Sequence, residues 1–129
     1  MNTIDLNFNL TEEQELLKKT AKDFAEVYLE PGVIERDDKS ITPINEIKEM
    51  GKLGFMGMMV PEKWNGSGMD TMSYILAMEE ICCVDASAGV IMSVNNSLVC
   101  QIFLDWCSDK QKEKYLMKLS TGEFLGAFS

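Results

Sequence analysis

A stretch of 19 residues from Ala86 to Leu104 carries no charged side chain, and it constrains the fold more than any other part of the sequence. The stretch is long enough to raise the question of a membrane span. Amides and hydroxyls are costly in hydrocarbon, however, and they occur throughout it, at Ser93, Asn95, Asn96, Ser97 and Gln101. The sequence therefore predicts a helix enclosed by protein on most sides, and no membrane partner. Its polar strip can meet other helices or face a ligand cavity, and both alternatives stay open here.

Capping signals predict where other helices begin. Thr11 with Gln14, and Ser108 with Gln111, have the spacing of a capping box, and Asp70 can cap the helix that follows it. Apolar residues then recur at intervals of three and four, as on one face of a helix. The pattern predicts an all-α fold with helices over 11–30, 43–53, 71–84, 86–104 and 108–122, and a structured loop over 55–70.

The chain ends in an apolar run, 124–129, that is typical of the start of a β-strand. A strand without a neighbour leaves its backbone hydrogen-bonding groups unpaired, and the rest of the sequence offers no second strand. We therefore expect a piece cut at a domain boundary, or a chain that needs another polypeptide. A non-catalytic helical interaction module is the alternative from a different functional class.

Composition excludes several classes of function. The chain has no histidine, which rules out Ser-His, Cys-His and His-metal sites within it, and we expect no catalytic residue and no metal. Its net charge of -9 argues against nucleic acid as a partner. The cysteines lack C-x-x-C spacing and are expected to be reduced, mostly buried thiols: Cys82, Cys83, Cys100 and Cys107. No targeting segment is recognisable at the start, so a cytoplasmic location is expected.

Several segments, in order and spacing, resemble the N-terminal domain of acyl-CoA dehydrogenases. They include the runs NLTEEQ, MGKLGF, PEKWNGSGMD and MEEI, and the SDKQK and GEFLGAFS runs near the end. The run AGVIMSVNNSL is most similar to the short-chain, butyryl-CoA type. Another flavoenzyme of the same fold, such as a branched-chain acyl-CoA dehydrogenase or a flavin monooxygenase relative, is the alternative within the enzyme class.

The resemblance implies an orthogonal bundle of about five to six helices over 1–122, with 123–129 as the start of a middle β-domain. It also implies FAD as cofactor, an acyl-CoA substrate oxidised to a trans-2-enoyl-CoA, electron-transferring flavoprotein as acceptor and a homotetramer. In the family, the catalytic glutamate lies in a C-terminal domain that this sequence lacks. The chain alone is therefore expected to bind FAD weakly or not at all, and to be inactive.

The resemblance also carries over a small set of site residues. The charge-free helix lines the acyl pocket in the family, which implies four lining residues on one side of it: Ile91, Met92, Asn95 and Val99. Bulky Met92 with Asn95 would shorten the pocket, in keeping with a four-carbon substrate. Phe128 and Ser129 fall at the start of the strand that packs along the flavin, which implies that they contact FAD.

Overall fold

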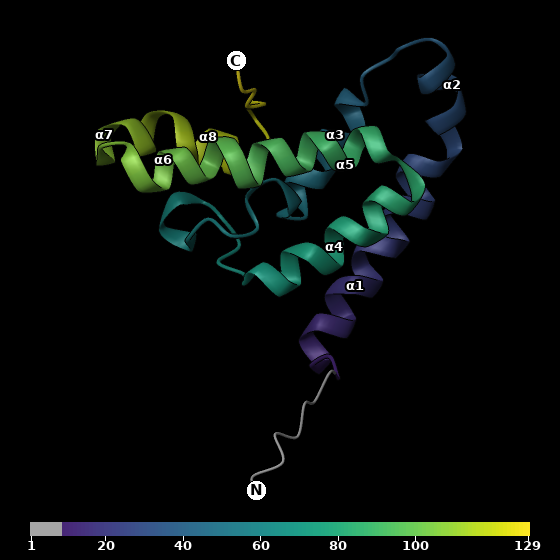
Figure 1. The fold of residues 1–129 in the computed structure, drawn as a ribbon, viewed down its shortest axis with the longest axis horizontal. Helices are drawn as coiled ribbons and strands as arrows, with labels where there is room; N and C mark the ends of the chain where they lie inside the picture. The colour runs from purple at the N-terminus through teal and green to yellow at the C-terminus, as the bar shows by residue number, and fades with distance from the viewer. Residues whose placement is uncertain (1–8) are drawn as a thin grey trace, which may run out of the picture.

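Helices provide the regular structure of residues 9–129, the part of the chain that the computed structural model describes (Figure 1). The α-helices are α1 (Glu12–Phe24), α2 (Val33–Asp38), α3 (Ile44–Lys52), α4 (Thr71–Val84), α5 (Ala86–Ser93), α6 (Gln101–Trp106), α7 (Asp109–Gln111) and α8 (Met117–Ser120). π-helical segments extend or join them at Ala25–Leu29, Val94–Cys100 and Lys112–Leu116. Short 3-10 turns lie at Glu30–Gly32, Phe55–Gly57 and Glu62–Trp64. The predicted all-α class is confirmed.

The predicted capping residues begin three of these helices. The Thr11 hydroxyl accepts a hydrogen bond from the backbone N–H of Gln14 at 3.2 Å, and the Gln14 side chain accepts one from the Thr11 N–H at 3.0 Å. At α7 the Gln111 side-chain oxygen accepts hydrogen bonds from the Ser108 N–H at 2.9 Å and from the Ser108 hydroxyl at 2.8 Å. The Asp70 carboxylate accepts from the N–H of Ser73 at 2.7 Å. These bonds satisfy backbone donors that a helix leaves unpaired at its first turn.

The charge-free stretch forms one long rod, in which α5, the π-helical segment and α6 follow one another without a break (Figure 1). By length and composition alone, this rod of Ala86–Trp106 could cross a membrane, and a third of its most apolar part is buried inside the structure. The pair α1 and α4 lies side by side and runs obliquely to the rod, while α7 and α8 return along its α6 end (Figure 1).

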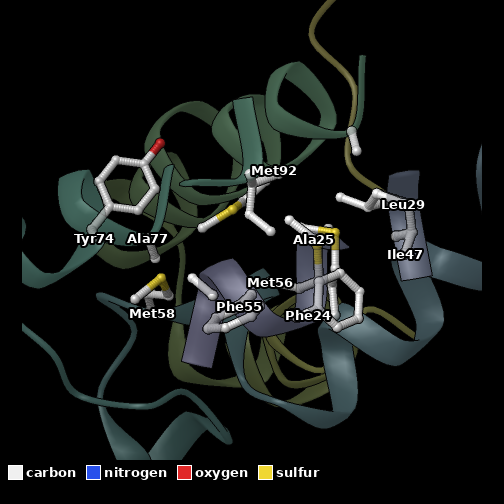
Figure 2. Close-up of a cluster of buried hydrophobic side chains, with 14 residues drawn as sticks. Phe24, Ala25, Leu29, Ile47, Phe55, Met56, Met58, Tyr74, Ala77 and Met92 are labelled. Carbon is white, nitrogen blue, oxygen red and sulfur yellow. The ribbon is translucent and has the colours of Figure 1, made fainter. Parts of the chain in front are cut away.

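The rod contributes to two clusters of buried side chains. The larger cluster lies between α1, α3, α4 and α5, and Figure 2 shows Met92 in it with Phe55 and Met58. The smaller cluster includes Cys100 from the rod together with Trp64, Leu119 from α8 and Leu116 just before it. Because one continuous helix enters both clusters, it fixes the two halves of the core relative to each other.

Arg36 ties three segments together beneath the surface. Its guanidinium lies 2.9 Å from the Asp85 carboxylate and 3.2 Å from that of Glu46, and it also donates to the carbonyl of Leu29 at 2.6 Å. Asp85 is also the N-cap of α5, where its second oxygen accepts from the N–H of Ala88 at 3.0 Å. The ion pair thus fastens α2 to α3 and to the junction between α4 and α5.

Some sequence-based expectations are wrong in detail. The charged stretch before Thr42 forms α2, which the periodicity did not predict. Pro43 is the N-cap of α3 rather than its first residue, and the structure gives no side-chain capping bond there. Cys82 and Cys83 on α4 are exposed rather than buried, although the Cys82 sulfur lies next to Gly89 of α5.

The expected strand at the end of the chain is not formed among the residues that the structure describes. Residues 124–129 have no regular secondary structure. The physical reason is that a strand is stabilised by the hydrogen bonds of a neighbouring strand, and the described residues supply none. The assignment of 123–129 to a middle β-domain stays a prediction.

Candidate functional site

Asn95 lies in the π-helical segment of the rod with none of its surface exposed. Its side-chain amide donates hydrogen bonds to the carbonyls of Met56, at 2.7 Å, and Leu119, at 3.0 Å. Its side-chain oxygen accepts from the backbone N–H of Gly126 at 3.0 Å. This single side chain therefore joins the turn after α3, the end of α8 and the C-terminal segment to the rod.

The neighbouring Asn96 is 2% exposed and is engaged in the same way with a different set of partners. Its amide donates to the carbonyls of Phe55, at 2.8 Å, and Met92, at 2.9 Å. Its oxygen accepts from the N–H of Met58 at 2.8 Å. Backbone groups of the protein itself thus satisfy the hydrogen-bonding groups of both buried amides. The sequence left open whether the polar strip meets protein or a ligand cavity, and for these two residues the structure shows protein.

The four residues expected to line an acyl pocket differ in their surroundings. Met92 and Asn95 have no exposed surface in this structure. Ile91 and Val99 are partly exposed, but Ile91 packs against the larger cluster and Val99 against the smaller one. The structure does not bring the four together around one described cavity. A role of all four residues in substrate binding stays a prediction.

The two residues expected to contact FAD lie at the end of the described chain. Phe128 is 72% exposed, and Ser129 is exposed as well. The segment that carries them is held to the helices by two hydrogen bonds, from the Phe124 N–H to the Lys118 carbonyl at 3.0 Å and from Gly126 to Asn95. An exposed ring on a held segment fits a stacking contact with a flat ring system such as a flavin.

An apolar ridge runs along the outer side of the rod, consisting of Leu98, Ile102 and Trp106. These residues recur every four positions, and they are 44%, 43% and 84% exposed. Exposed apolar groups in one row are typical of a surface that another protein segment covers.

The described cavities lie away from the expected acyl-pocket residues, from the expected flavin contacts and from the apolar ridge. One of about 440 Å³ is lined by α2 and by the start of α5, including Arg36, Asp85 and Ser87. The Arg36 charge is already paired with Asp85 and Glu46, which leaves the cavity without a free cationic group from this side chain. The buried Nε of Arg36 has no hydrogen-bond partner among the described residues.

The titratable groups give no sign of a catalytic constellation in residues 9–129. Burial raises the pKa of the Cys100 thiol to about 12, which keeps it protonated and unreactive at neutral pH. The carboxylate of Glu79 raises the pKa of Lys18 in an exposed pair on α1 and α4. Within the same residues, no group of three or more histidine, cysteine, aspartate or glutamate side chains could hold a metal ion.

The sequence did not predict the hydrogen bonds made by Asn96 and Gly126. It predicted that Asn95 lines an acyl pocket, whereas the structure surrounds this side chain with backbone groups of the protein. The signal for the buried amides was present, because two adjacent asparagines in a charge-free helix need hydrogen-bond partners. The identity of most of those partners was not accessible, since all of them except the Met92 carbonyl are backbone groups 24 to 41 residues away along the chain.

Comparisons with known proteins agree with one another. Residues 11–123 match the family described as "Acyl-CoA dehydrogenase, N-terminal domain". The chain is 38% identical over 123 residues to the short-chain specific acyl-CoA dehydrogenase of Clostridium acetobutylicum. The aligned region covers 95% of this chain and 32% of that protein.

Two solved structures share the fold. Butyryl-CoA dehydrogenase from Megasphaera elsdenii aligns with a TM-score of 0.85 and 40% identity, over 93% of this chain and 32% of that one. A glutaryl-CoA dehydrogenase from Mycobacterium smegmatis, in complex with FADH2, aligns with a TM-score of 0.86 and 27% identity, over 90% of this chain and 30% of that one. The chain thus spans about a third of the length of these relatives. From residue 11 to residue 123 it has the N-terminal helical domain of the acyl-CoA dehydrogenases, and it belongs to that family.

Proposed function

We propose that this chain is the N-terminal domain of a FAD-dependent short-chain acyl-CoA dehydrogenase, which oxidises a butyryl-CoA-like substrate to the trans-2-enoyl-CoA. The observation that carries the proposal is the 38% identity to a short-chain specific relative over 95% of this chain. The similarity to a butyryl-CoA dehydrogenase supports the same substrate class.

In this reaction the bound flavin supplies the redox chemistry by accepting a hydride, and the protein positions the reactants. This chain contributes surface rather than a catalytic group. The exposed Phe128, with Ser129, would form an edge of the flavin site, and Ile91 and Val99 part of the wall of the acyl pocket. No residue among 9–129 is assigned the role of the base.

The proposal includes electron-transferring flavoprotein as the electron acceptor, a homotetrameric assembly and a cytoplasmic location. The family resemblance supports the first two. The ridge of Leu98, Ile102 and Trp106 is apolar surface that further parts of such an assembly would cover.

The test is an activity profile of the protein as the cell makes it, purified in its native length. Butyryl-CoA, isobutyryl-CoA and octanoyl-CoA are compared as substrates with an artificial electron acceptor, after supplementation with FAD. We expect the highest kcat/KM with butyryl-CoA and formation of the trans-2-enoyl product. A preference for the branched substrate would overturn the short-chain assignment, and no turnover of any acyl-CoA would favour the non-catalytic module.

A further inference from the structure

The chain leaves the helical bundle at a defined place. Gly122 follows α8 with a positive φ of 74°, a conformation that glycine adopts without strain, and the helix ends there. Four residues later, the N–H of Gly126 reaches the side-chain oxygen of Asn95 at 3.0 Å. The segment that follows α8 is therefore anchored to the middle of the rod.

Asn95 is held rigidly for this contact. Both of its amide hydrogens are directed at carbonyl oxygens, those of Met56 and Leu119, so the amide nitrogen faces acceptors and the oxygen faces the Gly126 N–H. The reverse orientation would place an oxygen against two carbonyls and a nitrogen against a donor. Only one orientation of the side chain satisfies all three partners.

The Val99 side chain packs directly against Gly126 beside this hydrogen bond. A Cβ atom at Gly126 would lie 2.6 to 2.7 Å from three side-chain atoms of Val99, closer than such atoms pack. Val99 follows Asn95 by four residues, which places both on one side of the rod. The segment is thus fixed by a hydrogen bond to Asn95 and by a close approach that requires glycine.

We propose that Asn95 is a positioning residue, which fixes the C-terminal segment 126–129 on the helical bundle through the Gly126 N–H. Two residues of extended chain span at most about 7 Å, so anchoring Gly126 confines Phe128 to a small region. The consequence for flavin binding rests on the function proposed above. Asn95 then acts on the cofactor through the segment it holds rather than by touching substrate.

Asn96 provides a matched control. It lies beside Asn95, is equally buried and makes three hydrogen bonds of similar length. Its partners are all in the rod and in the turn after α3, and none is in the C-terminal segment. Alanine at either position leaves buried backbone groups unpaired, so both variants lose stability. Only Asn95→Ala removes the acceptor of the Gly126 N–H.

The experiment measures hydrogen–deuterium exchange of the backbone amides in the native protein and in the Asn95→Ala and Asn96→Ala variants. We expect the protection factor of the Gly126 amide to fall about tenfold further in Asn95→Ala than in Asn96→Ala, the effect of losing one hydrogen bond. Equal losses in the two variants would overturn the proposal, because they would reflect general loosening.

Gly126→Ala tests the same contact from the side of the C-terminal segment and keeps both buried amides. Its Cβ would collide with Val99, which packs against the smaller cluster, and we expect the segment to move away from the rod with the same loss of protection at residue 126. In the double variant with Asn95→Ala the loss should not increase, because both changes break one contact. Additive losses would contradict a shared anchor.

Flavin retention separates this proposal from the proposed function. In the flavin-bound protein, Asn95→Ala and Gly126→Ala should weaken flavin binding, whereas Asn96→Ala should weaken it less. Lost protection with unchanged flavin affinity would overturn the link between the anchor and the cofactor. If the native protein binds no flavin at all, the proposed function fails, and the exchange comparison still decides whether Asn95 positions the segment.

Discussion

At the scale of single residues, the ion pair of Arg36 and Asp85 makes the sharpest prediction about stability. The two side chains are 11% and 4% exposed, so Arg36→Met would leave a buried carboxylate without its cation. We expect the free energy of unfolding to fall by about 3–5 kcal/mol in urea denaturation. Lys39→Met, which removes an exposed pair with Glu35, should change it by about 0.5 kcal/mol or less. Similar losses in the two variants would contradict a structural role for the buried pair.

Asp70 makes a prediction about pH. The backbone N–H of Ser73 lowers the pKa of its carboxyl below the ordinary value of 3.8. A lowered pKa means that the carboxylate stabilises the fold above the unfolded-state pKa, and that this contribution is lost as the pH falls through the folded-state pKa.

Asp70→Asn keeps a good N-cap but removes this titration. In thermal denaturation between about pH 5 and pH 2, the advantage of the wild type over the variant should therefore shrink as the pH falls. A difference between the two midpoints that stays constant over this range would show that the carboxyl does not titrate as described.

At the scale of elements, the rod of α5, the π-helical segment and α6 packs against the smaller cluster and buries the Cys100 thiol there. The Cys100 thiol is fully buried, with a pKa raised to about 12, whereas Cys82 and Cys83 are exposed on α4. Because the thiolate is the reactive form, iodoacetamide should label the exposed Cys83 in the native protein, Cys82 more slowly since burial raises the pKa of its thiol, and Cys100 only in denaturant. Mass spectrometry of the labelled peptides checks this. Native labelling of Cys100 at the rate of the α4 cysteines would mean that the packing between the rod and the smaller cluster opens readily.

Elements with local signals could be predicted from the sequence, and those that depend on distant contacts could not. Thr11, Asp70 and Ser108 begin helices through bonds to residues three positions away, which a sequence pattern contains. The short α2 carries Arg36, whose partner Asp85 lies 49 residues away. The same difference explains the site, where the burial of Asn95 could be anticipated but its bond to Gly126 could not.

At the scale of the whole molecule, the ridge of Leu98, Ile102 and Trp106 leaves apolar surface exposed, as does Phe128. We expect the 129-residue chain to self-associate in size-exclusion chromatography with light scattering, because contiguous apolar surface drives association. Replacing Ile102 and Trp106 by serine should lower the mean mass. Ile34→Ser is the control, since Ile34 is 77% exposed on α2, outside the ridge. A monodisperse monomer for the unaltered chain would contradict the idea that the ridge needs a covering partner.

The central claim, that this chain is one domain of a flavin-dependent dehydrogenase, is tested most directly on the native gene product. Its mass is measured together with its absorption spectrum in the region of the flavin bands. The account predicts a polypeptide about three times as long as this chain, in line with its 32% share of the clostridial relative, with flavin bands that bleach on addition of butyryl-CoA. A colourless product of 14.5 kDa would contradict it and would mean that the fold exists here without the chemistry of the family.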